Sequence, residues 1–162
     1  MEIYWHLTET REAHHAWVPG KNETFVGTVN ELHIFLRTLR TLNKGKIELF
    51  CDMEGNNLGR NGTISLFQVT IKQYSHTWIL DITALGKTAF NTMCDHGTSL
   101  RGVLEDKNYP TAWFDLRNDQ SALFFLYGIR LDNVVDIQYF LLAINYFKSP
   151  KDSWAQEMTS KL

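Results

Sequence analysis

Cys51-Asp52-Met53-Glu54-Gly55 is the most informative part of the sequence. It ends an apolar run and leads through a Gly- and Asn-rich connection to the alternating residues 63–69. In a β-strand, side chains two residues apart point to the same face, so Asp52 and Glu54 share one face while Met53 packs on the other. Paired carboxylates suit a hard cation such as Mg²⁺ or Mn²⁺. The alternative is that the pair only ends an edge strand in solvent.

Length and composition indicate one ordinary globular domain. The chain has 162 residues, of which 44% are hydrophobic and 21% charged, and its net charge is -2. We expect an irregular lead-in over residues 1–24 and a single domain over residues 25–162. The net charge argues against a strongly basic, non-specific nucleic-acid binder, although an enzyme can still hold phosphates locally through metal ions.

Several protein classes find no support in the sequence. No apolar run approaches the ~20 residues that cross a bilayer, and the N-terminus lacks the features of a secretory signal, so we expect no membrane association and a nuclear or cytoplasmic location. Cys51 and Cys94 lack the spacing of a zinc site or a disulfide framework, so both are expected to be reduced. The sequence contains neither a phosphate-binding glycine loop nor a serine-hydrolase elbow.

The hydrophobic periodicity predicts an α/β fold with a mixed sheet. A helix is predicted from Asn30, as its cap, to Leu42, and three strands that follow it form an antiparallel meander. The predicted strands of the meander are 47–54, 63–71 and 77–82. The later predicted elements are helices 85–91 and 99–105, strand 112–114, helix 119–127, strand 134–135 and helix 137–147.

A second acidic position follows the strand at 112–114. Metal-assisted cleavage with two cations needs carboxylates from several separate elements. Asp119 lies where a strand ends and a helix begins, which is where α/β sheets gather ligands. By itself Asp119 would be interpreted as a helix cap. Asp115 is the other candidate for the metal, with a role in the turn as its own alternative.

Basic and aromatic residues lie near both acidic motifs. Arg60 and Arg117 are candidates for contacting substrate phosphates, and the alternative for each is a structural pair with a nearby carboxylate. The aromatic residues suit either base stacking or core packing, and their positions in strand and helix patterns favour the core. These aromatic residues are Trp113, Phe114, Phe124 and Phe125.

Together these features resemble the DEDD-type 3'-5' exonuclease domain, in the branch that contains RNase D, the Werner-type exonuclease and Egalitarian-like proteins. The resemblance covers about residues 47 to 140, in order and at suitable spacing. It rests on Asp52-Met53-Glu54, Leu58-Gly59-Arg60-Asn61-Gly62, Ser65-Leu66-Phe67-Gln68, Trp78-Ile79-Leu80-Asp81-Ile82, Ser99-Leu100, Leu104-Glu105-Asp106, the block from Phe114 to Leu123, and Val135-Asp136-Ile137-Gln138.

The resemblance implies an RNase H-like fold, two Mg²⁺ or Mn²⁺ ions, and removal of nucleotides from the 3' end of RNA or single-stranded DNA by an activated water. Asp52 and Glu54 match the first-motif ligands of the family. Asp119 matches the second-motif aspartate, since it precedes a helical leucine by four residues as that aspartate does. Asp115 and Gln68 are expected beside these ligands.

The chain departs from the family at the third motif, Tyr-x-x-x-Asp, which brings the fourth carboxylate and the general base. Tyr139 is followed four places on by Ala143, and Tyr146 by Pro150. We therefore expect a C-terminally truncated domain with impaired activity, because general acid-base help is worth ~10²–10⁴-fold in rate. The alternative is a catalytically inactive module that binds RNA or a protein partner. Uncovered apolar residues on helix 137–147 further predict a homo-oligomer or a protein partner.

Overall fold

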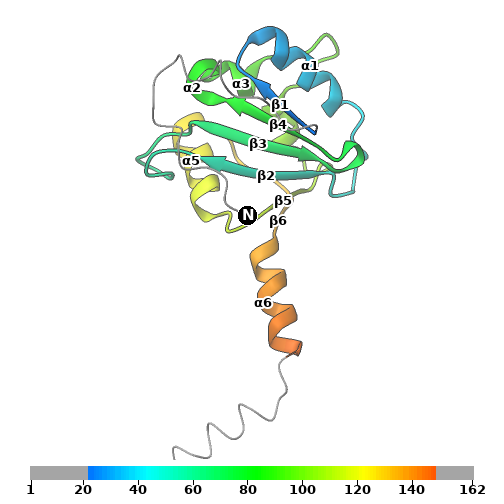
Figure 1. The fold of residues 1–162 in the computed structure, drawn as a ribbon, viewed down its shortest axis with the longest axis vertical. Coiled ribbons are helices and arrows are strands. Elements are labelled where there is room, and N and C mark those ends of the chain that lie inside the picture. Colours follow the sequence, from blue (N-terminus) through cyan, green and yellow to red (C-terminus); the bar gives the residue numbers. More distant parts are fainter. Residues whose placement is uncertain (1–21, 149–162) are drawn as a thin grey trace, which may run out of the picture.

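A six-stranded mixed sheet forms the centre of the computed structural model, which describes residues 22–148, with side chains as far as residue 144 (Figure 1). The strands are β1 (Glu23–Val26), β2 (Leu49–Glu54), β3 (Leu66–Ile71), β4 (His76–Asp81), β5 (Thr111–Trp113) and β6 (Val134–Asp136). Their order is β1-β4-β3-β2-β5-β6. The pairs β2–β3 and β3–β4 are antiparallel, whereas β1–β4, β2–β5 and β5–β6 are parallel. The predicted mixed sheet and its antiparallel meander are therefore confirmed.

Strand β1 is an element that the sequence pattern does not predict. The pattern indicates an irregular lead-in over residues 1–24, yet β1 begins at Glu23 and pairs in parallel with β4, placing Val26 beside Leu80. Four residues are too few to establish an alternating pattern, and the partner strand lies far along the chain. The lead-in over residues 1–21 lies outside the described residues, so the domain boundary stays a prediction.

Alternation along β2 orients the acidic pair. Leu49, Cys51 and Met53 are buried, and the residues between them are exposed. Asp52 and Glu54 therefore share one face of the sheet, as the spacing predicts. On the other face, Phe67 of β3 stacks on the buried ring of Trp113, with ring centroids 5.8 Å apart. This packing spans β2 and joins the meander to the parallel half of the sheet.

Within residues 22–148, six α-helices and one short 3-10 helix accompany the sheet. They are α1 (Val29–Leu39), η2 (Lys72–Tyr74), α2 (Ile82–Leu85), α3 (Thr88–Asn91), α4 (Leu100–Leu104), α5 (Arg117–Tyr127) and α6 (Ile137–Lys148). The cap of α1 is Thr28, which forms a capping box with Glu31, so the prediction of Asn30 as the cap is wrong. The helix predicted over 85–91 is divided into α2 and α3, because Gly86 adopts a left-handed φ of +54° between them.

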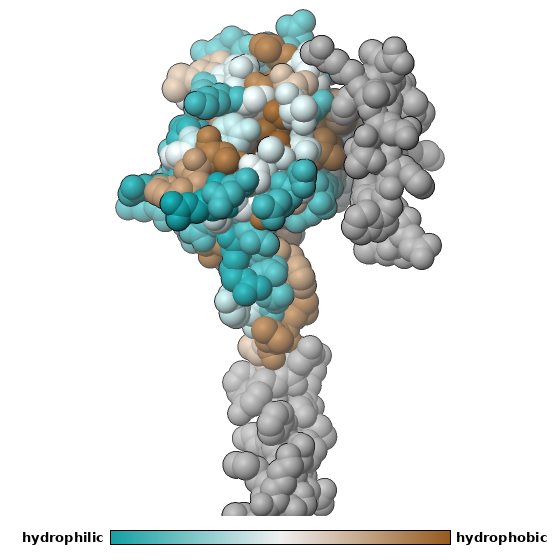
Figure 2. Space-filling model, turned by 90° about the vertical axis from the view of Figure 1, so that its left-hand side faces the viewer, coloured by the Kyte–Doolittle hydropathy of each residue, from teal (hydrophilic) through white to brown (hydrophobic). Residues whose placement is uncertain are grey.

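Helix α6 follows β6 and extends away from the sheet (Figure 1). Its large apolar side chains are exposed and form a brown surface along the helix in Figure 2. These side chains are Tyr139, Phe140, Leu141, Leu142 and Ile144. No helix within residues 22–148 combines the length and the apolar character that crossing a membrane requires.

Candidate functional site

The first part of the site is the end of β2. Asp52 lies opposite Gln68 of β3 in the sheet register, so the amide side chain is next to the carboxylate on the same face. Burial raises the pKa of Asp52, although the residue is partly exposed. Burial and then the charge of Asp52 raise the pKa of Glu54. The two carboxylates therefore affect each other, and each would gain from a nearby cation.

Asp119 on α5 is the third carboxylate, and it is only 4% exposed. Its Oδ1 atom is buried without a hydrogen-bond partner among the described residues. Burial, followed by the negative charges of Asp52 and Glu54, raises the pKa of Asp119 to about 7. Helix α5 has Leu116 as its N-cap, so the interpretation of Asp119 as the cap is excluded. A buried carboxylate with an unpartnered oxygen, beside two other carboxylates, is costly to the fold unless something positive compensates it.

The three carboxylates are suitable ligands for a divalent cation, but they do not converge on one position. Within residues 22–148, no three His, Cys, Asp or Glu side chains lie close enough together to hold a metal ion. Asp52, Glu54 and Asp119 nevertheless interact electrostatically. Carboxylate oxygens, among them the unpartnered Oδ1 of Asp119, are the ligands that Mg²⁺ and Mn²⁺ prefer. The positions of the three side chains do not define which oxygens would bind the ion.

Asp115 turns away from this cluster towards Arg117. Its carboxylate accepts two hydrogen bonds from the guanidinium, from Nε at 2.7 Å and from Nη2 at 3.0 Å. The hydrogen bond from Arg117 lowers the pKa of Asp115, and Asp115 has a left-handed φ of +54°. For Arg117, the structure thus contains the carboxylate pair that the sequence offers as an alternative to phosphate contact.

Asp136 has a positioning role that the sequence motif does not reveal. Its carboxylate accepts hydrogen bonds from the main-chain N–H groups of Asp115 and Leu116, each at 3.1 Å, and from that of Gln138 at 3.0 Å. The end of β6 thereby holds the start of α5, the helix that carries Asp119. The signal present in the sequence is an acidic residue just before the helix predicted over 137–147, which is a position typical of a helix cap.

Three of the four aromatic residues predicted to pack in the core are exposed. Trp113 is buried, but Phe114, Phe124 and Phe125 are 55%, 39% and 49% exposed, so the prediction is wrong for them. For the two phenylalanines on α5, the reason is that this helix buries Asp119, together with Ala122 and Leu123. The two phenylalanines that follow Leu123 are thereby rotated towards solvent.

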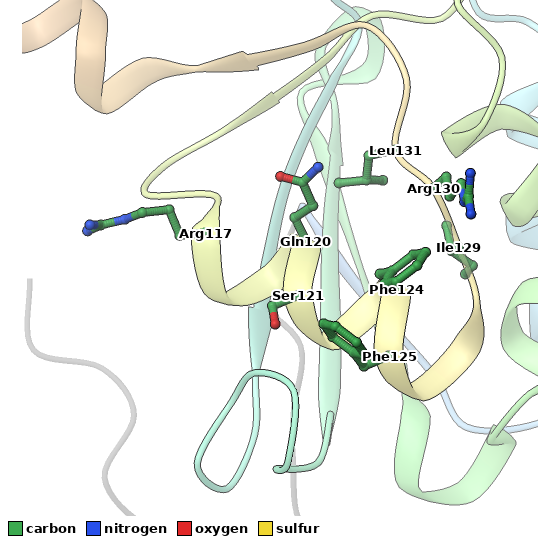
Figure 3. A pocket seen from close by; sticks show the side chains of 8 residues that line it. All are labelled: Arg117, Gln120, Ser121, Phe124, Phe125, Ile129, Arg130 and Leu131. Atoms are coloured by element: carbon green, nitrogen blue, oxygen red, sulfur yellow. The ribbon is translucent and has the colours of Figure 1, made fainter.

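The outward face of α5 borders an open groove of about 450 Å³ (Figure 3). The lining residues come from α5 and the segment after it: Arg117, Gln120, Ser121, Phe124, Phe125, Ile129, Arg130 and Leu131. Arg60, on the connection between β2 and β3, places its guanidinium 4.4 Å from the ring centroid of Phe125. Arg60 makes no ion pair with a carboxylate in the part of the chain that the structure describes, so the structural pair offered as its alternative is not found there.

Comparison with known proteins gives partial matches. No family model matches the sequence. Over 85 residues, or 52% of this chain, the sequence is 36% identical to the piRNA biogenesis protein EXD1 of Mus musculus, and the match covers 14% of that protein. The matched part of this chain therefore corresponds to a small part of that relative.

Among solved structures, the fold is similar to Trypanosoma brucei RNase D in complex with RNA U12, with a TM-score of 0.63, 23% identity, and coverage of 75% of this chain and 39% of that one. It is also similar to the EXD2 exonuclease domain soaked in Mg and GMP, with a TM-score of 0.58, 19% identity, and coverage of 75% and 58%. The expected similarity to DEDD-type exonuclease domains is thus confirmed at the level of the fold, which is RNase H-like.

Proposed function

We propose that this domain acts on the 3' ends of nucleic acids as a 3'-5' exonuclease-type module, with Asp52, Glu54 and Asp119 as the ligands of Mg²⁺ or Mn²⁺. The observation that carries the proposal is the buried third carboxylate, whose pKa is raised to about 7 beside the other two. Burying a carboxylate beside two others is unfavourable, and a bound cation would offset this cost. The similar fold of an RNase D bound to RNA supports nucleic acid as the substrate class.

The protein groups have separate tasks in this proposal. A bound divalent cation would polarise a phosphodiester and activate a water. Asp52 and Glu54 would hold it from the sheet, and Asp119 would hold it from the helix by rotation of its side chain. Gln68 lies beside Asp52 in the register and would orient that carboxylate. Arg60, which lies against the ring of Phe125, is available for a phosphate of the substrate away from the bond that is cleaved.

A catalytically inactive module that binds nucleic acid is the second candidate. The observation that favours it is the composition of α6, because residues 137–148 contain no aspartate or glutamate that could act as a fourth ligand. Within residues 22–148 the three carboxylates do not converge on one position, which also favours the inactive module. In this case the cluster would bind a cation and a 3' end without efficient cleavage.

The deciding experiment uses 3'-labelled single-stranded RNA and DNA with Mg²⁺ or Mn²⁺. The chain is compared with Asp52→Asn and Asp119→Asn, and with Asp95→Asn as a matched control at an exposed carboxylate that pairs with Arg37. Stepwise shortening that both site variants abolish and the control retains supports the exonuclease. Binding without shortening supports the inactive module. Neither binding nor shortening overturns both candidates.

We also infer that α6 mediates self-association, because its large apolar side chains are exposed. The expected result is a concentration-dependent mass in sedimentation analysis. Phe140→Gln with Leu142→Gln should shift the chain towards the monomer. Met93→Gln changes another exposed apolar residue and serves as the control. A single monomeric species at high concentration would contradict the inference.

A further inference from the structure

The two faces of α5 carry different chemistry. The inward face presents Asp119 to the carboxylate cluster, and the outward face presents the rings of Phe124 and Phe125 to solvent. In Figure 3 these two rings extend from the helix beside one another, with Gln120 and Ser121 further along the same helix. Exposed phenylalanine rings on a surface helix are costly, because they leave large apolar area in water. The exposed face is therefore a candidate binding surface separate from the carboxylates.

Guanidinium groups accompany both rings. Arg60 lies 4.4 Å from the ring centroid of Phe125, and Arg130 lies 5.4 Å from that of Phe124. Neither guanidinium makes an ion pair with a carboxylate within residues 22–148. No aspartate or glutamate is found among the described residues that line the groove. The groove is thus locally basic on a chain whose net charge is -2.

We propose that this groove binds a single-stranded nucleic acid, with bases stacking on Phe124 and Phe125 and phosphates contacting Arg60 and Arg130. Aromatic platforms lined by unpaired cations are the chemistry that single strands require, since every base has a face to stack and every phosphate carries a charge. A duplex would hide its base faces and is not expected to bind there. The amide of Gln120 and the hydroxyl of Ser121 can meet base edges from the same helix.

The inference deepens the proposed function and rests on it for the presence of nucleic acid on this domain. Because Asp119 and the groove lie on opposite faces of α5, the groove would hold nucleotides away from the 3' end rather than the bond that is cleaved. It should therefore increase affinity for longer strands and leave the chemistry at the carboxylates unchanged.

The test is binding of fluorescein-labelled RNA and DNA strands of two lengths, short and long, and of a duplex, to the full chain in EDTA. Removing divalent cations separates the groove from the carboxylate cluster. Phe125→Leu and Arg60→Ala should each weaken binding of the long strand about tenfold, with a smaller effect on the short strand. Arg60→Ala should also reduce the salt dependence of binding by about one phosphate contact.

Matched controls are Phe114→Leu, which changes an exposed phenylalanine outside the groove, and Arg40→Ala, which changes an exposed arginine on the far end of α1. Both should bind like the unmodified chain. Arg60→Lys keeps the charge and should recover part of the affinity, which a misfolded variant would not do. Equal affinity for RNA and DNA would show that binding in the groove depends on base stacking and phosphate contacts alone.

Outcomes separate this inference from the proposed function. Unchanged affinity in both groove variants, with shortening that depends on Asp52, overturns the groove alone. A duplex that binds as tightly as the single strand also overturns it. No binding of any strand by the unmodified chain overturns the groove and the proposed substrate class together.

Discussion

The carboxylate of Asp136 accepts a hydrogen bond from the main-chain N–H of Leu116 at 3.1 Å, which ties the end of β6 to the cap of α5. Replacing this side chain leaves three main-chain donors, those of Asp115, Leu116 and Gln138, without their acceptor. Hydrogen bonds to a charged group are worth about 1.5–3 kcal/mol each, so we expect Asp136→Ala to lower the free energy of unfolding by at least about 3 kcal/mol. Urea denaturation measures this.

The control for this prediction is Asp132→Ala, at a nearby exposed aspartate. Asp136→Asn keeps one oxygen acceptor and should lie between the alanine variant and the unmodified chain. Equal stability of Asp136→Ala and Asp132→Ala would show that the tie contributes nothing.

Stability of the metal-free protein should depend on pH through Asp119. The pKa of Asp119 in the folded chain is raised from 3.8 to about 7. As the pH rises above 3.8 the unfolded chain loses this proton first, so folded stability falls by about 1.4 kcal/mol per pH unit until the pH passes the folded pKa. The stabilising contribution is complete at low pH and lost above about 7.

Asp119→Asn removes this titration. The variant should therefore be more stable than the unmodified chain at pH 8 without metal, and the difference should disappear towards pH 4, in thermal melts across this pH range. Adding Mg²⁺ at pH 8 should stabilise only the unmodified chain. A variant that is less stable than the unmodified chain at pH 8 would contradict the burial cost assigned to Asp119.

Arg101 closes the end of α5. Its guanidinium donates to the carbonyl of Tyr127 at 2.6 Å, to that of Gly128 at 3.1 Å, and to the side chain of Asn91 at 2.8 Å. We expect Arg101→Ala to cost about 3 kcal/mol, because carbonyls at the helix end lose charged donors. Arg101→Lys should recover less than half, since one ammonium cannot reproduce the fork. Chemical denaturation distinguishes the two variants.

Gly55 follows the acidic pair and has no room for a side chain. A Cβ placed there would overlap the main-chain carbonyl of Thr63, across the connection between β2 and β3. Gly55→Ala should lower stability by at least ~2 kcal/mol, because main-chain atoms must move to admit the methyl group. Gly27→Ala is the matched control, since its Cβ would meet only the ring of Phe25 at 3.2 Å. Comparable losses in both variants would contradict the steric reason.

Local sequence patterns predicted where the three carboxylates lie in the fold. Alternation along β2 places Asp52 and Glu54 on one face, and the strand-to-helix boundary places Asp119 in the first turn of α5. Their role as metal ligands stays a prediction. The outward position of Phe124 was not predictable by the same rules. Those rules place phenylalanine inside and aspartate outside, whereas α5 buries Asp119 and exposes the rings.

Long-range contacts account for the other differences. Strand β1 is defined by its parallel pairing with β4, and four residues of sequence contain no sign of that partner. The role of Asp136 depends on a loop that precedes α5 and reaches it only in the folded chain. Both features arise from tertiary contacts that local periodicity does not encode.

The position of β2 has a consequence for the order of folding. Its antiparallel neighbour β3 begins at Leu66, soon after β2 ends at Glu54, whereas its parallel neighbour β5 begins only at Thr111. Pairings between distant segments form more slowly, because a long loop must close first. A chain in which only the meander has formed therefore contains Asp52 and Glu54 without Asp119. The complete carboxylate cluster exists only once the parallel half has docked, so cation binding would report that folding has finished.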